Sequence, residues 1–185
     1  FRWRRCLRPL VKVAMPAALS SFIKHLWLDA NDARRLVSPA QLERITQLVQ
    51  ASEQQHSGEL RVCVEASLPV SDLWRVNQGH SLAQAVRERA VALFSQLKVW
   101  DTAHNNGVLI YVLLAEHAIE VVADRGLSAH VPAAHWAALV ARMADAFKRG
   151  DYEAGLSAAL TNITGKLVQH FALPATTELQ GASEI

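Results

Sequence analysis

The sequence predicts an α/β protein, a three-layer α/β/α sandwich built around a small mixed sheet. The first observation is a continuous apolar run from Val108 to Leu114, which is typical of a strand buried on both faces. The second is the set of apolar stripes at helical spacing on both sides of this run. The third is the element order, which places a helix between two strands and so predicts a parallel βαβ unit with a right-handed crossover.

The first helix is expected to begin after Ser38 and to run to about Gln55. Ser38-Pro39-Ala40-Gln41 has a capping serine, a proline at the first helical position and a glutamine that completes a capping box. A strand follows over 59–66, with apolar residues alternating with polar ones. This alternation predicts a half-buried strand near the edge of the sheet.

The second helix is predicted from Ser81 to about Lys98, after a loop over 69–79. The buried strand then turns at 115–117 into a third strand over 119–123, which must be antiparallel to it. Two further helices complete the domain. One spans 133–149 and stops at Gly150, and the other begins at Asp151 and carries its apolar stripe to Phe171.

Length and composition are those of one domain with a substantial core. The chain has 185 residues, of which 51% are hydrophobic. We expect a basic N-terminal arm over 1–37 that is partly helical or disordered, a folded domain over 38–172, and a flexible tail over 173–185. Two cysteines make no disulfide framework.

Charge is unevenly distributed along the chain. Residues 1–35 contain eight basic and two acidic side chains, whereas the other 150 residues carry a net charge of −4. A nucleic-acid-binding domain needs a basic face on its folded part, so no nucleic acid partner is expected. The sequence instead predicts a mildly acidic domain behind a basic arm.

Residues 1–28 allow three interpretations. A basic start followed by an apolar stretch resembles a signal sequence, but Pro16 interrupts the apolar part and Lys24 follows soon after it. The second interpretation is an interfacial segment that contacts a membrane surface through Trp3, Phe22, Trp27 and the arginines. A disordered extension is the third. The cytoplasm or the membrane periphery is expected rather than export.

The predicted topology brings three polar turns to one end of the sheet. The starts of the two parallel strands and the end of the antiparallel strand share this end, so loops 57–59, 101–106 and 124–128 should converge. Oxygen-bearing side chains and glycine turns suit Ca²⁺ or Mg²⁺, and Arg125 could receive an anion. The candidate metal ligands are Glu59, Asp101, Asn105 and Asp124. The alternative is that these residues are ordinary turn formers.

Other kinds of catalytic site find no support in the sequence. There is no HExxH, GxSxG, Walker or GxGxxG pattern, which removes the zinc protease, lipase, nucleotide-hydrolase and Rossmann interpretations. Cys63 has no evident base beside it and is expected to pack in the sheet. The eight histidines are scattered without paired metal-ligand spacing.

Four motifs occur in order along the chain: Ser57 to Val62, Asn106 to Leu109, Ile119 to Val121 with Arg125 to Leu127, and Gly150 to Leu156. Together these motifs resemble the TPM domain family of bacterial and thylakoid lumen proteins. The family fold is an α/β/α sandwich, and the resemblance spans roughly 38–171. Acid phosphatase activity is attributed to some members and divalent metal binding to others, so the resemblance implies a site at the same converging loops.

The chain departs from the family pattern where carboxylates are usual. Asn105 stands at the first position of the family's Asp-Asn-Gly, and Ser128 stands where the family has glutamate. The acidic residue usual a few positions later is missing from 130–134. We therefore expect a non-catalytic interaction or assembly module with a protein partner, at a membrane surface if residues 1–28 contact one. The alternative is a weak divalent-metal-dependent phosphatase with its site at the three loops.

Overall fold

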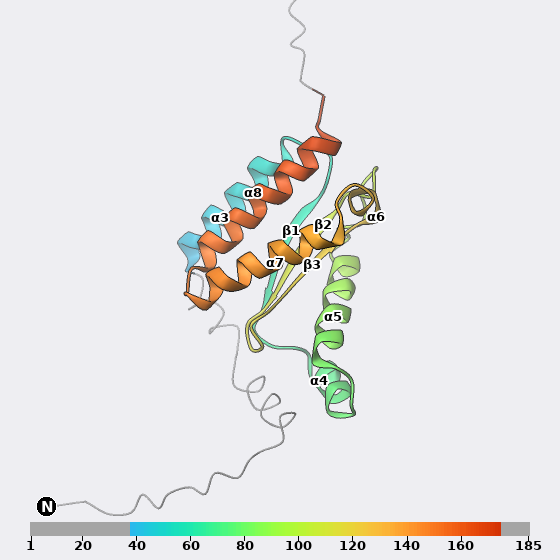
Figure 1. Cartoon of the computed structure of the whole chain (residues 1–185), viewed down its shortest axis with the longest axis vertical. Helices are drawn as coiled ribbons and strands as arrows, with labels where there is room; N and C mark the ends of the chain where they lie inside the picture. The colour runs from blue at the N-terminus through green and yellow to red at the C-terminus, as the bar shows by residue number, and fades with distance from the viewer. Residues whose placement is uncertain (1–37, 175–185) are drawn as a thin grey trace, which may run out of the picture.

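The computed structural model describes residues 38–174, and it confirms the predicted α/β class and the small mixed sheet (Figure 1). The predicted arm over 1–37 and residues 175–185 of the predicted tail lie outside the described residues. Within 38–174, no helix combines the length and the apolar character needed to cross a bilayer.

The sheet has three strands in the order β1-β2-β3. Strand β2 pairs in parallel with β1 and antiparallel with β3, as the element order predicts. Every residue of β2 is buried because β2 is the central strand and has helices over both faces. The strands are β1 (Leu60–Glu65), β2 (Val108–Leu113) and β3 (Ala118–Ala123).

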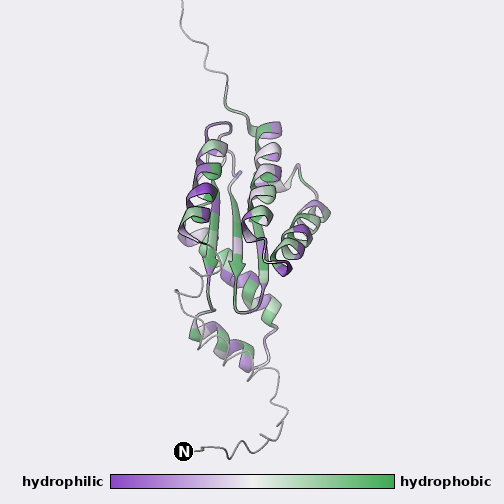
Figure 2. Ribbon diagram, turned by 90° about the vertical axis from the view of Figure 1, so that its left-hand side faces the viewer, coloured by the Kyte–Doolittle hydropathy of each residue, from purple (hydrophilic) through white to green (hydrophobic). Residues whose placement is uncertain are grey.

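Two apolar clusters cover the two faces of the sheet. Alternate residues of β2 point to opposite sides, with Ile110 in one cluster and Tyr111 in the other. Helices α3 (Pro39–Glu53), α7 (Ala133–Lys148) and α8 (Tyr152–Phe171) cover the first face. Helix α5 (Leu82–Gln96) covers the other face, with α4 (Val70–Asn77) beside it. Figure 2 shows the mostly hydrophobic strands between helices that carry both hydrophobic and hydrophilic residues.

The predicted capping box begins α3. The Gln41 backbone N–H donates to Ser38 Oγ at 3.3 Å, and the Ser38 N–H donates to Gln41 Oε1 at 2.8 Å. Ser81 precedes α5 as predicted, but its side chain makes no capping hydrogen bond. Gly150 follows α7 with a φ of 82°, a conformation that glycine adopts without strain.

Two short helices replace turns and loops predicted from the sequence. The predicted loop over 69–79 was wrong, because α4 occupies most of it and buries Leu73 against α5. Arg75 of α4 donates to Asp72 and to Glu88 of α5 at 2.9 Å each. Eight residues are too few to show a helical period. The second short helix, α6 (Arg125–Ser128), begins after Asp124.

Candidate functional site

The three predicted loops meet at one end of the sheet. We call residues 57–59, 101–107 and 124–128 the loop junction. The Asp124 N–H donates to the Gly107 carbonyl at 2.9 Å, and the Gly126 N–H donates to the Asn105 carbonyl at 2.8 Å. Asn106 Nδ2 donates to Ser57 Oγ at 3.1 Å, which joins the first loop to the second.

Glycine allows the loops to approach this closely. A Cβ atom on Gly126 would collide with the carbonyl oxygen of His104 and would lie 2.6 Å from that of Asn105. A Cβ atom on Gly58 would lie 2.7 Å from the Asn106 carbonyl oxygen. Each contact is with backbone, which cannot rotate away as a side chain can. The junction therefore depends on the absence of a side chain at these two positions.

Arg125 connects two of the predicted ligand residues. Its Nη2 donates to Asn105 Oδ1 at 2.9 Å, and its backbone N–H donates to Asp124 Oδ1 at 2.7 Å. Asp124 is the N-cap of α6. The predicted anion-binding residue and two of the four predicted metal ligands therefore lie together, with a guanidinium among the oxygen atoms.

Glu59 and Asp101 are arranged differently. Glu59 Oε1 accepts from Arg61 Nε at 2.5 Å. Burial, together with the negative charge of Glu59, raises the pKa of Glu53. Asp101 is exposed, and its backbone N–H donates to the Lys98 carbonyl at 2.9 Å. The Glu59 carboxylate therefore has its own cationic partner, Arg61, and does not share Arg125 with Asn105.

The donor set does not fit a divalent cation as it is arranged. Ca²⁺ and Mg²⁺ need several oxygen ligands that converge on one point. Arg125 instead places a positive charge against Asn105 Oδ1, one of the predicted ligand atoms. Among residues 38–174, no group of three or more His, Cys, Asp or Glu side chains is positioned to hold a metal. Two buried oxygen atoms nevertheless lack a hydrogen-bond partner, Asn106 Oδ1 and Asp124 Oδ2.

His56 supports the first loop, a role that no pattern in the sequence indicated. Its Nδ1 lies 3.1 Å from the Gly58 carbonyl oxygen and must donate to it, so Nε2 of the neutral ring accepts from Ser52 Oγ at 2.7 Å. Thr164 Oγ1 of α8 lies 2.7 Å from the same Ser52 oxygen. Burial lowers the pKa of His56, which is only 2% exposed.

This lowered pKa predicts that folding stability falls in mild acid. The unfolded chain takes up a proton at His56 at a higher pH than the folded chain does, so stability is lost as pH falls below about 6.5. One such group changes the unfolding free energy by at most about 1.4 kcal/mol per pH unit. Urea unfolding at pH 7.5, 6.5 and 5.5 should show a shallower decline for His56→Gln than for the unaltered chain. A decline as steep as in the exposed-site control His80→Gln would contradict the assignment.

Comparisons with known proteins agree with this architecture. A family model of the TPM domain matches residues 30–166. The NMR structure of the BA42 protein from the psychrophilic bacterium Bizionia argentinensis is 24% identical, with a TM-score of 0.62 over 75% of this chain and 86% of that one. The N-terminal domain of a protein from P. gingivalis is 21% identical, with a TM-score of 0.57 over 75% and 83%. No curated protein sequence matches the chain.

These two structures share the fold, and at such low identity the likeness extends no further than the fold. The family match is broader evidence, because it includes β1, the β2–β3 hairpin and most of α8. It also includes all three loops of the junction. The chain belongs to the TPM domain family.

Proposed function

We propose that this TPM domain is a non-catalytic interaction module, and that its loop junction binds an anionic group of a partner protein through Arg125. The observation that carries the proposal is the hydrogen bond from Arg125 to Asn105 Oδ1. In this arrangement a cation of the protein itself lies against Asn105, one of the predicted metal ligands. Asn105 is neutral, so it orients the guanidinium without cancelling its charge.

The chemistry of Arg125 suits a carboxylate or a phosphate. A guanidinium has five N–H donors in a planar fork, and the bond to Asn105 uses one of them. The side chain is exposed at the end of the molecule. Paired N–H donors directed at two oxygen atoms form charge-assisted hydrogen bonds, which are about twice as strong as neutral ones.

An NMR titration tests the proposal with two probes, a glutamate-rich peptide and inorganic phosphate. We expect amide shifts confined to the loop junction in the full chain, and at least a tenfold weaker response in Arg125→Ala. Arg142→Ala is the matched control, since Arg142 is an exposed arginine on α7. Equal responses from the two variants, or no response at the junction to either probe, would contradict the proposal.

A metal-dependent phosphatase is the second candidate, and one observation favours it. Asn106 Oδ1 and Asp124 Oδ2 are buried oxygen atoms without partners, and such atoms are costly unless a water or an ion reaches them. For Asn105 to join them as a ligand of Ca²⁺ or Mg²⁺, Arg125 would have to release Asn105 Oδ1. Glu59 would also have to release Arg61 to serve as a ligand.

We also propose that residues 1–28, which lie outside the described residues, contact a membrane surface. The support for this contact is the excess of basic side chains near the start of the chain. Co-sedimentation with vesicles that contain phosphatidylserine should fall at least fivefold when residues 1–28 are removed. Equal binding by both forms would exclude this contact.

A further inference from the structure

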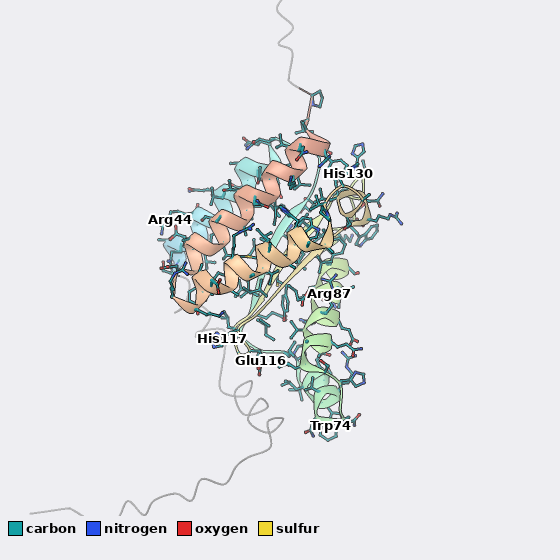
Figure 3. The ribbon with its side chains drawn as sticks, in the orientation of Figure 1. Arg44, Trp74, Arg87, Glu116, His117 and His130 are labelled. Atoms are coloured by element: carbon teal, nitrogen blue, oxygen red, sulfur yellow. The ribbon has the colours of Figure 1, made fainter. Side chains whose placement is uncertain are left out.

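Two histidines from distant parts of the chain lie face to face beside the loop junction. His130 is in the turn between α6 and α7, and His170 is in the last turn of α8. Their ring centres are 4.5 Å apart, and the ring planes differ by 10°. Figure 3 shows His130 at the end of the molecule where α6 lies. Their separation in sequence explains why no metal-ligand spacing was visible.

Phe171 packs against both rings. Its centre is 5.9 Å from that of His130 and 6.4 Å from that of His170, edge-on in each case. This aromatic contact restrains the two imidazoles on the protein side, while His130 remains exposed on the other. The pair is therefore both partly ordered and accessible to a small ion.

The separation of the rings suits a shared metal ion. Two imidazoles that bind one ion through one nitrogen each, at about 2.0 to 2.1 Å, have ring centres roughly 5 Å apart. The observed 4.5 Å is close to this value, but the rings are stacked 10° from parallel, so both side chains must rotate for one nitrogen of each to reach a common ion.

We propose that His130 and His170 form a binding site for a late first-row divalent metal such as Zn²⁺ or Ni²⁺. Neutral imidazole nitrogen prefers these ions to Ca²⁺ and Mg²⁺, which take oxygen ligands. Two protein ligands leave the remaining coordination positions to water. This site is separate from the loop junction, and it does not depend on the anion-binding role of Arg125.

A metal ion bound by His130 and His170 would also link the end of α8 to the α6–α7 turn. The residues after His170 already contact the first loop and the turn before it. The Ser57 N–H donates to the Phe171 carbonyl at 3.0 Å, and the Leu173 N–H donates to the Gln55 carbonyl at 3.1 Å. A metal link from His170 to the α6–α7 turn would add a third restraint at this end. Binding should therefore raise the melting temperature as well as perturb local signals.

The test is a Ni²⁺ titration of the full chain, followed by NMR line broadening, with Zn²⁺ affinity measured by calorimetry. We expect amides near 130 and 170 to broaden first, and His130→Asn and His170→Asn each to weaken Zn²⁺ binding at least tenfold. The double variant should bind no more weakly than either single variant, because one remaining imidazole cannot chelate. His80→Asn replaces an exposed histidine elsewhere and should leave the affinity unchanged.

The order of line broadening and the affinities of the variants distinguish a specific two-histidine site from nonspecific binding. Broadening that begins equally at all exposed histidines would overturn the proposal. So would losses of affinity in His130→Asn and His170→Asn no larger than in His80→Asn. Circular dichroism of both variants verifies that they fold, and both side chains lie at the surface rather than in either apolar cluster.

Discussion

Replacement of Gly126 by alanine is expected to destabilise the fold by at least about 3 kcal/mol, at the upper end of what overpacking costs. The new methyl group would collide with the His104 carbonyl oxygen and press on that of Asn105. Both atoms belong to the backbone of the second junction loop, so relief requires the loops to separate. That separation would also break the hydrogen bond from the Gly126 N–H to the Asn105 carbonyl.

Gly165→Ala is the matched control for this substitution. Gly165 lies in α8, and a Cβ atom there would meet nothing within 4 Å. Alanine is favoured over glycine inside a helix, so this variant should gain up to about 1 kcal/mol. Urea unfolding of both variants measures the contrast. A Gly126→Ala protein as stable as the unaltered chain would mean that the loops do not pack as the structure has them.

Arg89→Met is expected to cost about 2 to 3 kcal/mol, somewhat less than the loss of one member of a fully buried ion pair. Arg89 of α5 holds Glu65 through both carboxylate oxygens, and Tyr111 donates its hydroxyl to Glu65 Oε2 at 2.8 Å. The side chains of Arg89 and Glu65 are 19% and 21% exposed. Removal of the guanidinium leaves a largely desolvated carboxylate without its cation, and burial together with Glu65 already raises the pKa of Tyr111.

The control for Arg89 lies two residues earlier on the same helix. Arg87 pairs with Glu120 at 3.1 Å and donates to the Val121 carbonyl at 2.9 Å, but its side chain is 48% exposed. Exposed ion pairs contribute at most about 1 kcal/mol, so Arg87→Met should be the milder change. Equal losses of unfolding free energy in the two variants would show that burial does not govern the strength of the Glu65 network.

The long elements could be predicted from the sequence because their signals are local. The apolar run of β2 and the capping box at Ser38 depend on neighbouring residues alone. Loop convergence followed from topology, since a parallel pair and a hairpin leave few arrangements. Helix α4 could not be predicted in this way, because it is short and depends on Leu73 packing against α5.

The details of the site were less accessible to sequence reasoning. Spacing along the chain could not show that Arg61 holds Glu59 or that Arg125 donates to Asn105, since side-chain partners depend on the folded geometry. The support of Gly58 by His56 and the pairing of His130 with His170 also join side chains to partners that only the fold brings close. The residue types indicated where the candidate site lies, whereas the hydrogen-bond partners of those side chains determine what the site can bind.

The central claim is that Arg125, rather than a divalent metal ion, occupies the loop junction. The most direct measurement is aryl phosphate hydrolysis by the full chain with Mg²⁺, Ca²⁺ or Mn²⁺, alongside Asp124→Asn as the variant. We predict no turnover above the buffer rate with any of the three ions, and no difference between the two proteins. Metal-dependent turnover that Asp124→Asn abolishes would contradict this account and would establish the phosphatase alternative.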